Sequence, residues 1–349
     1  MTLRVAIAGG GFIGIDHAVA FAAQPDAELV AFVGRDLERT AAVAGRFGAR
    51  AYTDLAELLR HERPDALSVC TPTALHRPFV EAVAAAGVHI LLEKPMATSV
   101  ADCDAIEVAC MEAGVTLMLG FTHRFHAELL AAKRLIDEGR LGTPMLAQDV
   151  FTFGEYGPWP AWYYDRRLSG GGELMHDAVH LVDRLAWLIG SPVVEVYGRT
   201  TTYARGIDGV EDGAVAVMSF AGGAIASLFV NESTYPLRRD GESVPMPGRC
   251  ELEVHGSRGT IRYRTWHELV VDIAGEATSV IAGTDRGEMG REIREFLDAI
   301  LERRPPSVGA AEGRRGIAVV GAIYESERQG RPIRVDELFP EPASRPQAR

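Results

Sequence analysis

Short apolar runs alternate with amphipathic stretches along the first 120 residues of the chain. The runs predict buried strands, and the stretches between them have the apolar spacing of helices. This alternation predicts a parallel, doubly wound sheet, in which ligands bind beyond the carboxyl ends of the strands. Strands are expected at Leu3–Ala8, Glu28–Val33, Ala66–Cys70, His89–Leu92 and Thr116–Leu119, and helices include Ile15–Ala23, Asp54–Arg60, Arg77–Ala86 and Val100–Ala113.

After Gly120 the apolar segments become longer and follow one another more closely. Several strands in succession predict an α+β region with a large open, mostly antiparallel sheet. A loop is expected at Tyr235–Arg249 and a flexible tail at 340–349. Helices are expected at Ala127–Glu138, Glu173–Ile189, Gly290–Glu302 and Ala310–Gln329, and strands at Met145–Phe153, Val193–Tyr203, Ala214–Phe220, Ala224–Thr234, Cys250–His255, Thr260–Arg264 and Leu269–Ile273.

Composition narrows the function classes. The 349 residues carry a formal net charge of −12, which argues against a nucleic-acid or anionic-membrane partner. The uncharged stretch 214–231 is split by Gly222-Gly223, so it predicts two hairpin strands and no membrane span. The chain opens without a signal-peptide pattern, and its four cysteines have no paired spacing, so we expect free thiols in a cytoplasmic protein.

A glycine-rich turn follows the first expected strand. Gly9, Gly11 and Gly14 form the pattern GxGxxG, with Phe12 and Ile13 between the last two, and a helix follows. In this context one glycine allows a tight turn, one lets the backbone approach a pyrophosphate, and one lets helix and strand pack closely. The free N–H groups of the helix then favour phosphate. The turn therefore predicts a dinucleotide site.

The end of the second strand bears on the choice of dinucleotide. An NAD site usually has an acidic residue about 20 residues beyond the glycines. At that distance from Gly14 the chain has Gly34, followed by Arg35 and Asp36. Without a carboxylate at Gly34, Arg35 is free to pair with a 2′-phosphate, which predicts NADP. The alternative is that Asp36 takes the acid's place and NAD is bound.

Two further loops lie at the carboxyl ends of strands. One contains Thr71, Pro72 and His76, and the other contains Glu93-Lys94-Pro95. Proline ends the strand and presents Lys94 at the sheet edge, where an ammonium group can hydrogen-bond a reacting oxygen. The alternative is a surface lysine paired with Glu93.

These motifs resemble the Gfo/Idh/MocA family, named for glucose–fructose oxidoreductase, inositol dehydrogenase and a rhizopine-catabolism protein. The resemblance covers nearly the whole chain. Besides the motifs above, it includes Gly120-Phe121-Thr122-His123-Arg124-Phe125, Gly170-Gly171-Gly172 leading to His180, and Glu295-Phe296-Leu297.

The resemblance implies a dinucleotide-binding Rossmann domain over residues 1–122. It also implies an α+β domain over 123–339 that binds substrate and whose open sheet often forms the interface of an oligomer, here a homodimer or homotetramer. Thr71, Pro72, His76, Glu93 and Lys94 are expected at the cofactor. Lys94 would also contact the substrate oxygen, and His180 would act as the acid/base.

The helix 173–189 departs from the family at one position. Many dehydrogenases of the family have an aspartate four residues before the histidine, where this chain has His176, followed by Asp177. On an α-helix one residue is about 100° of rotation, so Asp177 cannot simply substitute. We expect His176 to assist His180, with both histidines and Asp177 contacting substrate, while Asp183 and Arg184 lie on a solvated face.

Other features complete the expected substrate site. Arg124, Trp162 and Tyr163 are candidates, since aromatic faces suit sugar rings. The glycines before the helix are expected to permit close approach of a ligand. Glu173, His176 and His180 have a spacing that also suits a metal, but the sequence compels no third ligand, so no metal is expected.

The expected function is hydride transfer between NADP (or NAD) and a sugar, an inositol-like polyol or a derived ketone. One alternative is a lyase or hydrolase that uses a tightly bound cofactor in a transient oxidation. The other is a cofactor-binding protein without catalysis, against which Lys94 and His180 argue.

Overall fold

The computed structural model describes residues 2–154, 159–202, 207, 209–234, 237–239, 242–244, 248–283 and 285–340. The chain divides into two compact units. The first comprises Met1–Ala131, Pro160–Gly171 and Ala282–Arg315, and the second comprises Ala132–Trp159, Gly172–Ile281 and Gly316–Arg349. Two segments from the later part of the chain therefore return to the unit that begins it.

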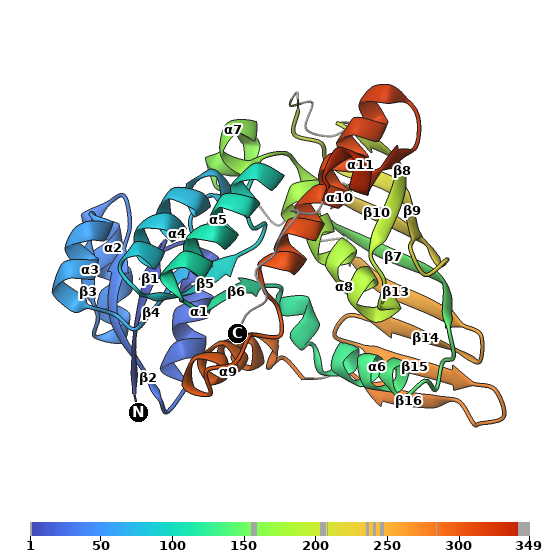
Figure 1. The fold of residues 1–349 in the computed structure, drawn as a ribbon, viewed down its shortest axis with the longest axis horizontal. Coiled ribbons are helices and arrows are strands. Elements are labelled where there is room, and N and C mark those ends of the chain that lie inside the picture. The colour runs from blue at the N-terminus through green and yellow to red at the C-terminus, as the bar shows by residue number, and fades with distance from the viewer. Residues whose placement is uncertain are drawn as a thin grey trace. The chain divides into compact units, whose positions relative to one another are not determined.

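The first unit contains a six-stranded sheet in the order β3-β2-β1-β4-β5-β6 (Figure 1). Every neighbouring pair of strands is parallel, which confirms the predicted doubly wound sheet. All residues of β4 are buried, and β1 is buried except for Arg4, as expected for strands covered on both faces. The strands are β1 (Leu3–Ala8), β2 (Ala27–Val33), β3 (Arg50–Tyr52), β4 (Ala66–Val69), β5 (His89–Glu93) and β6 (Leu117–Gly120).

Helices cover both faces of this sheet (Figure 1). Helix α1 packs against α9 through an edge-to-face contact between Phe21 and Phe296, whose ring centroids are 6.3 Å apart, and α4 packs against α5. The helices are α1 (Phe12–Ala22), α2 (Leu37–Ala44), α3 (Leu55–Glu62), α4 (His76–Ala85), α5 (Val100–Ala113), α7 (Arg166–Ser169) and α9 (Glu288–Leu301), with 3₁₀ turns at Gly45–Phe47, Thr73–Leu75, Thr122–Phe125 and Ala161–Tyr164.

The second unit contains a nine-stranded sheet in the order β16-β15-β14-β13-β7-β10-β9-β8-β17. The central pair β7 and β10 is parallel, and the pairs on both sides of it are antiparallel, which confirms a mostly antiparallel sheet. The strands are β7 (Pro144–Gly154), β8 (Val193–Thr201), β9 (Gly213–Phe220), β10 (Ile225–Thr234), β13 (Arg249–Gly256), β14 (Gly259–Arg264), β15 (Glu268–Ile273), β16 (Ser279–Ala282) and β17 (Ile333–Arg334).

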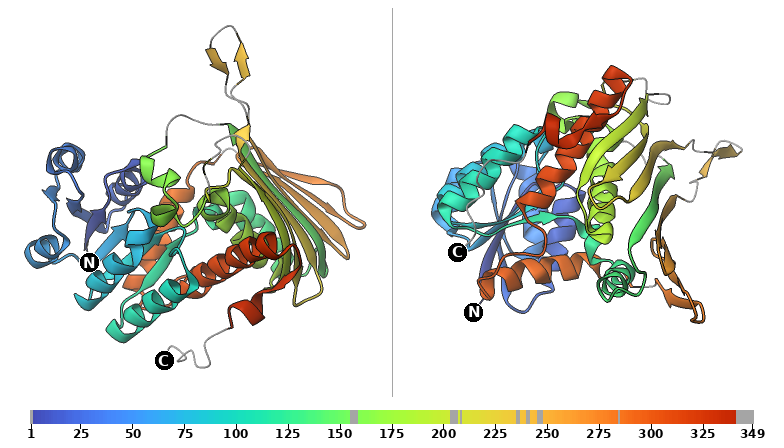
Figure 2. Two further views of the ribbon diagram at one scale, coloured as in Figure 1. Left: turned by 90° about the horizontal axis from the view of Figure 1, so that it is seen from above. Right: turned by 45° about the vertical axis from the view of Figure 1, so that its right-hand side comes forward.

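One face of this sheet is covered by helices, as Figure 2 shows most clearly from above. Helix α8 (Val179–Ile189) packs on β7 and β10, and Ile323 of α10 (Ala310–Gln329) contacts β8 at Gly198. Along β10 every second side chain is buried, namely those of Ala226, Leu228 and Val230. Helix α11 (Val335–Leu338) contacts β8, and α6 (Ala127–Asp137) precedes β7 in the chain.

Two expectations about irregular segments have different outcomes. Within the expected loop 235–249, the described residues include a short antiparallel pair, β11 (Leu237–Arg239) and β12 (Glu242–Val244). The expected tail after Pro340 lies outside the described residues.

The stretch 214–231 forms the antiparallel pair β9–β10, as predicted. No described helix is both long and apolar enough to span a bilayer. Cys70, Cys103, Cys110 and Cys250 are free thiols, as expected.

Candidate active site

The three glycines of the first turn have three different surroundings. A Cβ on Gly9, whose φ is +105°, would lie 2.3 Å from the carbonyl oxygen of Cys70, and a Cβ on Gly14 would lie 2.0 Å from that of Gly9. A Cβ on Gly11 would have no heavy atom within 4 Å. Gly9 and Gly14 are therefore required by the turn and by close packing, whereas Gly11 faces open space that a ligand can enter.

Helix α1 begins directly after this open space. Gly11 is its extended N-cap, and no side chain caps the first turn. The helix starts at Phe12, earlier than the predicted Ile15, because Phe12 and Ile13 already form the first turn. The free N–H groups and the positive end of the helix fit a pyrophosphate.

The end of β2 leaves one basic side chain exposed. Arg35 is exposed, while a carboxylate oxygen of Asp36 accepts a hydrogen bond from the N–H of Arg39 and caps α2. A Cβ on Gly34 would lie 2.5 Å from the hydroxyl of Thr40, so this position has little room for an acidic side chain.

The loops after β4 and β5 are joined by His76. This histidine is buried, and its ring nitrogens lie 2.9 Å from the carbonyl oxygen of Thr71 and 3.0 Å from that of Pro95. The hydroxyl of Thr71 is buried without a hydrogen-bond partner among the described residues. His76 thus holds the two loops together, and Thr71 has an unused polar atom at the edge where a cofactor is expected.

Lys94 follows β5 directly and is half-buried. The preceding Glu93 is buried, with Oε2 accepting a hydrogen bond from the N–H of Lys94 and Oε1 lying 3.0 Å from Nε2 of His17. A Cβ on Gly120 would lie 2.7 Å from Oε1 of Glu93. His17 and the close approach of Gly120 therefore fix the carboxylate of Glu93, which in turn orients the backbone of Lys94.

The aromatic candidates belong to the first unit. Trp162 and Tyr163 lie in the turn Ala161–Tyr164, with ring centroids 4.2 Å apart. Helix α7, which follows that turn, packs on Thr73–Leu75, so this segment borders the loop of Thr71 and Pro72. Arg124 is buried, with a guanidinium nitrogen 3.4 Å from the carbonyl oxygen of Ser307.

In the second unit, the backbone of Glu211 packs against Gly172, the third glycine before the helix, and leaves no room for a side chain there. A Cβ on Gly172 would lie 1.9 Å from the carbonyl oxygen of Glu211. The Glu211 carboxylate accepts hydrogen bonds from the N–H groups of Gly172 and Leu174 and from the hydroxyl of Tyr324. The expectation that this glycine admits a ligand is therefore wrong, because the chain's own backbone fills the space. No local motif marks Glu211.

The helix that carries the two histidines is not α-helical throughout. A π-helical turn at Leu174–Ala178 precedes α8, so the 100° step of an α-helix does not hold around His176 and Asp177. His176 and His180 are 4% and 5% exposed, and Asp177 is half-buried. π-Helical turns occur often at functional sites.

The expectation that Asp183 and Arg184 lie on a solvated face is wrong. Both are buried, and Arg184 makes a two-pronged ion pair with Asp149 of β7. The guanidinium also lies 6.0 Å from the ring centroid of Tyr263. Because α8 packs on the sheet, the polar positions Asp183 and Arg184 are buried, and Arg184 is paired with Asp149 of β7 instead of being solvated.

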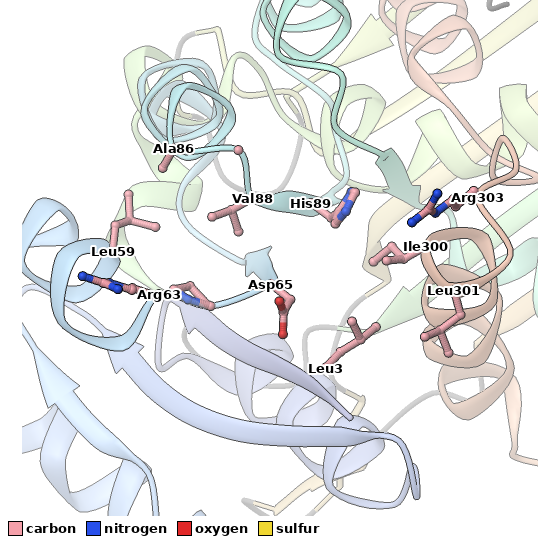
Figure 3. A pocket seen from close by; sticks show the side chains of 12 residues that line it. Leu3, Leu59, Arg63, Asp65, Ala86, Val88, His89, Ile300, Leu301 and Arg303 are labelled. Atoms are coloured by element: carbon pink, nitrogen blue, oxygen red, sulfur yellow. The ribbon is translucent and has the colours of Figure 1, made fainter. Parts of the chain in front are cut away.

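A pocket of about 500 Å³ lies at the opposite edge of the parallel sheet. Leu3, Asp65 and His89, which line it, stand at or just before the amino ends of β1, β4 and β5. Figure 3 shows the guanidinium of Arg303 and the imidazole of His89 facing each other there. Since ligands of doubly wound sheets bind at the carboxyl edge, this pocket is not the expected cofactor site.

Comparison with known families identifies the class. The family model described as "Oxidoreductase family, NAD-binding Rossmann fold" matches residues 3–121. The family model described as "GFO/IDH/MocA C-terminal domain" matches residues 129–262. The chain therefore belongs to the Gfo/Idh/MocA family. It is an NAD(P)-dependent dehydrogenase or reductase that acts on CH–OH groups, and the comparisons do not favour the lyase, hydrolase or non-catalytic alternatives.

Individual relatives agree with this class. The chain is 27% identical to D-apiose dehydrogenase of Paraburkholderia graminis over 95% of this chain and 90% of that protein. It is 28% identical to inositol 2-dehydrogenase 3 of Saccharopolyspora erythraea over 96% of each chain. The aldose-aldose oxidoreductase of Caulobacter crescentus, solved with glycerol, superposes with a TM-score of 0.84 at 26% identity over 96% of this chain and 100% of the other.

Proposed function

We propose that the protein transfers a hydride between NADP and a sugar, an inositol-like polyol or a ketone derived from one. The observation that carries the proposal is the glycine turn, in which Gly11 leaves open space at the uncapped amino end of α1. The named relatives support the substrate class, since they include dehydrogenases of a sugar and of inositol.

The preference for NADP over NAD rests on the end of β2. Arg35 is exposed, and Gly34 has little room for an acidic side chain next to Thr40. Asp36 uses one carboxylate oxygen to cap α2. An exposed guanidinium favours a 2′-phosphate, which it binds with two parallel hydrogen bonds.

Proton handling is assigned to two side chains. The nicotinamide, when bound, accepts a hydride from the CH–OH carbon or returns it. Lys94 donates a hydrogen bond to the reacting oxygen, and His180 takes the hydroxyl proton during oxidation and gives it back during reduction. Glu93 positions the backbone of Lys94, and His176 assists His180.

Substrate binding is assigned to Arg124, Trp162, Tyr163 and Asp177 together with Lys94 and the two histidines. The adjacent, tilted rings of Trp162 and Tyr163 offer an aromatic surface, which suits the C–H face of a sugar ring. Thr71 and Pro72 are assigned to the nicotinamide side of the cofactor, where the Thr71 hydroxyl needs a partner.

A screen of sugars and polyols with both cofactors tests the proposal. Reduced cofactor is measured by absorbance and products by mass spectrometry. We expect net cofactor reduction with at least one sugar or polyol and a loss of turnover by orders of magnitude in Lys94→Met, with cofactor affinity changed only a few-fold. Near-normal turnover in folded Lys94→Met protein refutes the role of Lys94. Product formation without net cofactor change refutes the dehydrogenase.

We also propose that the protein is a homodimer or homotetramer joined through the uncovered face of the nine-stranded sheet. Val215 and Val217 of β9 and Ile225 and Phe229 of β10 are 40–48% exposed, which is typical of an interaction surface. Light scattering of Val217→Glu tests this: its mass should fall, whereas Val108→Glu, at a similarly exposed valine of α5, should keep the wild-type mass. Equal masses for both variants refute the interface.

A further inference from the structure

Three buried side chains of the second unit come together at the start of the helical segment Leu174–Ile189, which carries His176 and His180 and is called the histidine helix below. Glu173, His176 and Glu232 each offer one ligand atom, and these atoms all lie within 4.8 Å of one another. Nδ1 of His176 is 3.9 Å from Oε1 of Glu173. The three residues are 0%, 4% and 2% exposed, respectively.

Two separate elements bring the three side chains together. Glu173 and His176 belong to the helical segment that Glu211 holds through Gly172 and Leu174. Glu232 comes from β10, on the buried side of the strand where Ala226, Leu228 and Val230 precede it. A carboxylate in the fourth inward position of an otherwise apolar row is costly unless something compensates its charge.

The three side chains together form a donor set that suits a cation. Two carboxylates held this close in a buried region repel each other unless a cation or a proton lies between them. An imidazole nitrogen beside two carboxylate oxygens is a common donor set for divalent transition metals, and two carboxylates balance a charge of 2+.

We propose that Glu173, His176 and Glu232 bind one divalent transition-metal ion, with Zn²⁺ as the reference ion. In tetrahedral geometry, metal–ligand bonds of about 2.0–2.2 Å place neighbouring donor atoms roughly 3.3–3.6 Å apart. The 3.9 Å between His176 and Glu173 closes to this range with a movement below 1 Å. Three protein ligands leave coordination positions open for water or a substrate hydroxyl.

A second buried cluster of similar composition has a different character. His17, Glu93 and Glu292 of the first unit also lie close together. Here Nδ1 of His17 lies 2.8 Å from the Ser68 hydroxyl, and Nε2 lies 3.0 Å from a carboxylate oxygen of Glu93. This cluster serves as the internal comparison for the metal site.

The sequence pattern alone pointed away from a metal. Glu173 and His176 are near each other in the chain, but the third ligand, Glu232, is contributed by a strand far along it. His180, which the spacing offered as a ligand, is left for proton transfer. The metal site does not depend on the proposed hydride transfer, because its test measures bound ion and not turnover.

Metal content of the tag-free, full-length protein tests the proposal. The protein is stripped with a chelator, loaded with Zn²⁺, desalted and measured by elemental analysis. We expect one equivalent per chain, and an at least hundredfold higher Kd for Zn²⁺ in Glu232→Gln and in Glu173→Gln. Loading with Co²⁺ should produce visible absorption bands that Zn²⁺ displaces.

Glu292→Gln is the matched control, since it replaces an equally buried glutamate of the other cluster by glutamine. It should keep one equivalent of Zn²⁺ and the same Kd. Circular dichroism and melting of each variant establish that it is folded. Failure of folded wild-type protein to retain Zn²⁺ overturns the proposal. Loss of the ion in Glu292→Gln with retention in Glu232→Gln also overturns it.

Discussion

Replacing Glu292 by glutamine should make the stability of the protein less dependent on pH between pH 6 and pH 8. Glu292 is fully buried on α9, with Oε1 3.9 Å from Nε2 of His17. Burial raises the pKa of its carboxyl group from 4.5 to about 8, and the charge of Glu93 adds to the rise, while His17 opposes it. In the folded protein Glu292 therefore keeps a proton that the unfolded chain loses.

The sign and size of the effect follow from these two pKa values. Where the folded state binds a proton that the unfolded state has released, the free energy of unfolding falls as pH rises, by about 1.4 kcal/mol per pH unit. With pKa values of 4.5 and about 8, the loss between pH 6 and pH 8 is about 2 kcal/mol. Glutamine has no proton to lose, so this part of the slope disappears.

His17 contributes a slope in the same direction. Burial opposes its protonation, but contacts with Cys70 and Glu93 hold the pKa of His17 well above its usual range. A base with a raised pKa in the folded state contributes stability that is lost as pH rises through that value. The variant keeps His17, so its stability should still fall with pH, but less steeply than that of the wild type.

Urea unfolding at pH 6, 7 and 8, followed by fluorescence and circular dichroism, measures the slopes. Glu57→Gln, at an exposed glutamate of the same unit, should keep the wild-type slope. Equal slopes for wild type and Glu292→Gln would show that Glu292 is ionised in the folded protein, contrary to this reasoning.

Three further predictions concern the cofactor and the histidines. Arg35→Ala should remove a preference for NADPH over NADH of about tenfold or more, measured by fluorescence titration, whereas Arg39→Ala should keep it; equal affinities in the wild type contradict the assignment. Gly11→Ala should weaken cofactor binding at least tenfold with stability changed by less than about 0.5 kcal/mol. Gly14→Ala, whose Cβ would lie 2.0 Å from a carbonyl oxygen, should lower the free energy of unfolding by roughly 1–3 kcal/mol; the reverse order of stabilities refutes this reading of the turn. His180→Asn should lower kcat by about 10²–10⁴-fold, and His176→Asn should mainly raise KM; an unchanged pH profile of kcat in His180→Asn contradicts the acid/base role.

Elements with local sequence signals could be predicted before the structure was known. Apolar runs and glycine positions predicted the parallel sheet, the turn at Gly9–Gly14 and most of the antiparallel strands. These signals are reliable because the period of burial along a strand or helix and the conformational demands of glycine belong to the residues themselves. The boundaries moved by a few residues where a cap decided them, as at Gly11.

Contacts between residues that are distant in the chain could be seen only in the folded protein. The ion pair of Arg184 with Asp149 turned an expected solvent face into a buried one, and the backbone of Glu211 occupied the space at Gly172. Glu232 reached Glu173 and His176 only because β10 lies against the histidine helix. Local periodicity predicts that a side chain is buried, but it does not predict which residue that side chain contacts. The contact depends on the order of the strands and on packing between segments far apart in the chain.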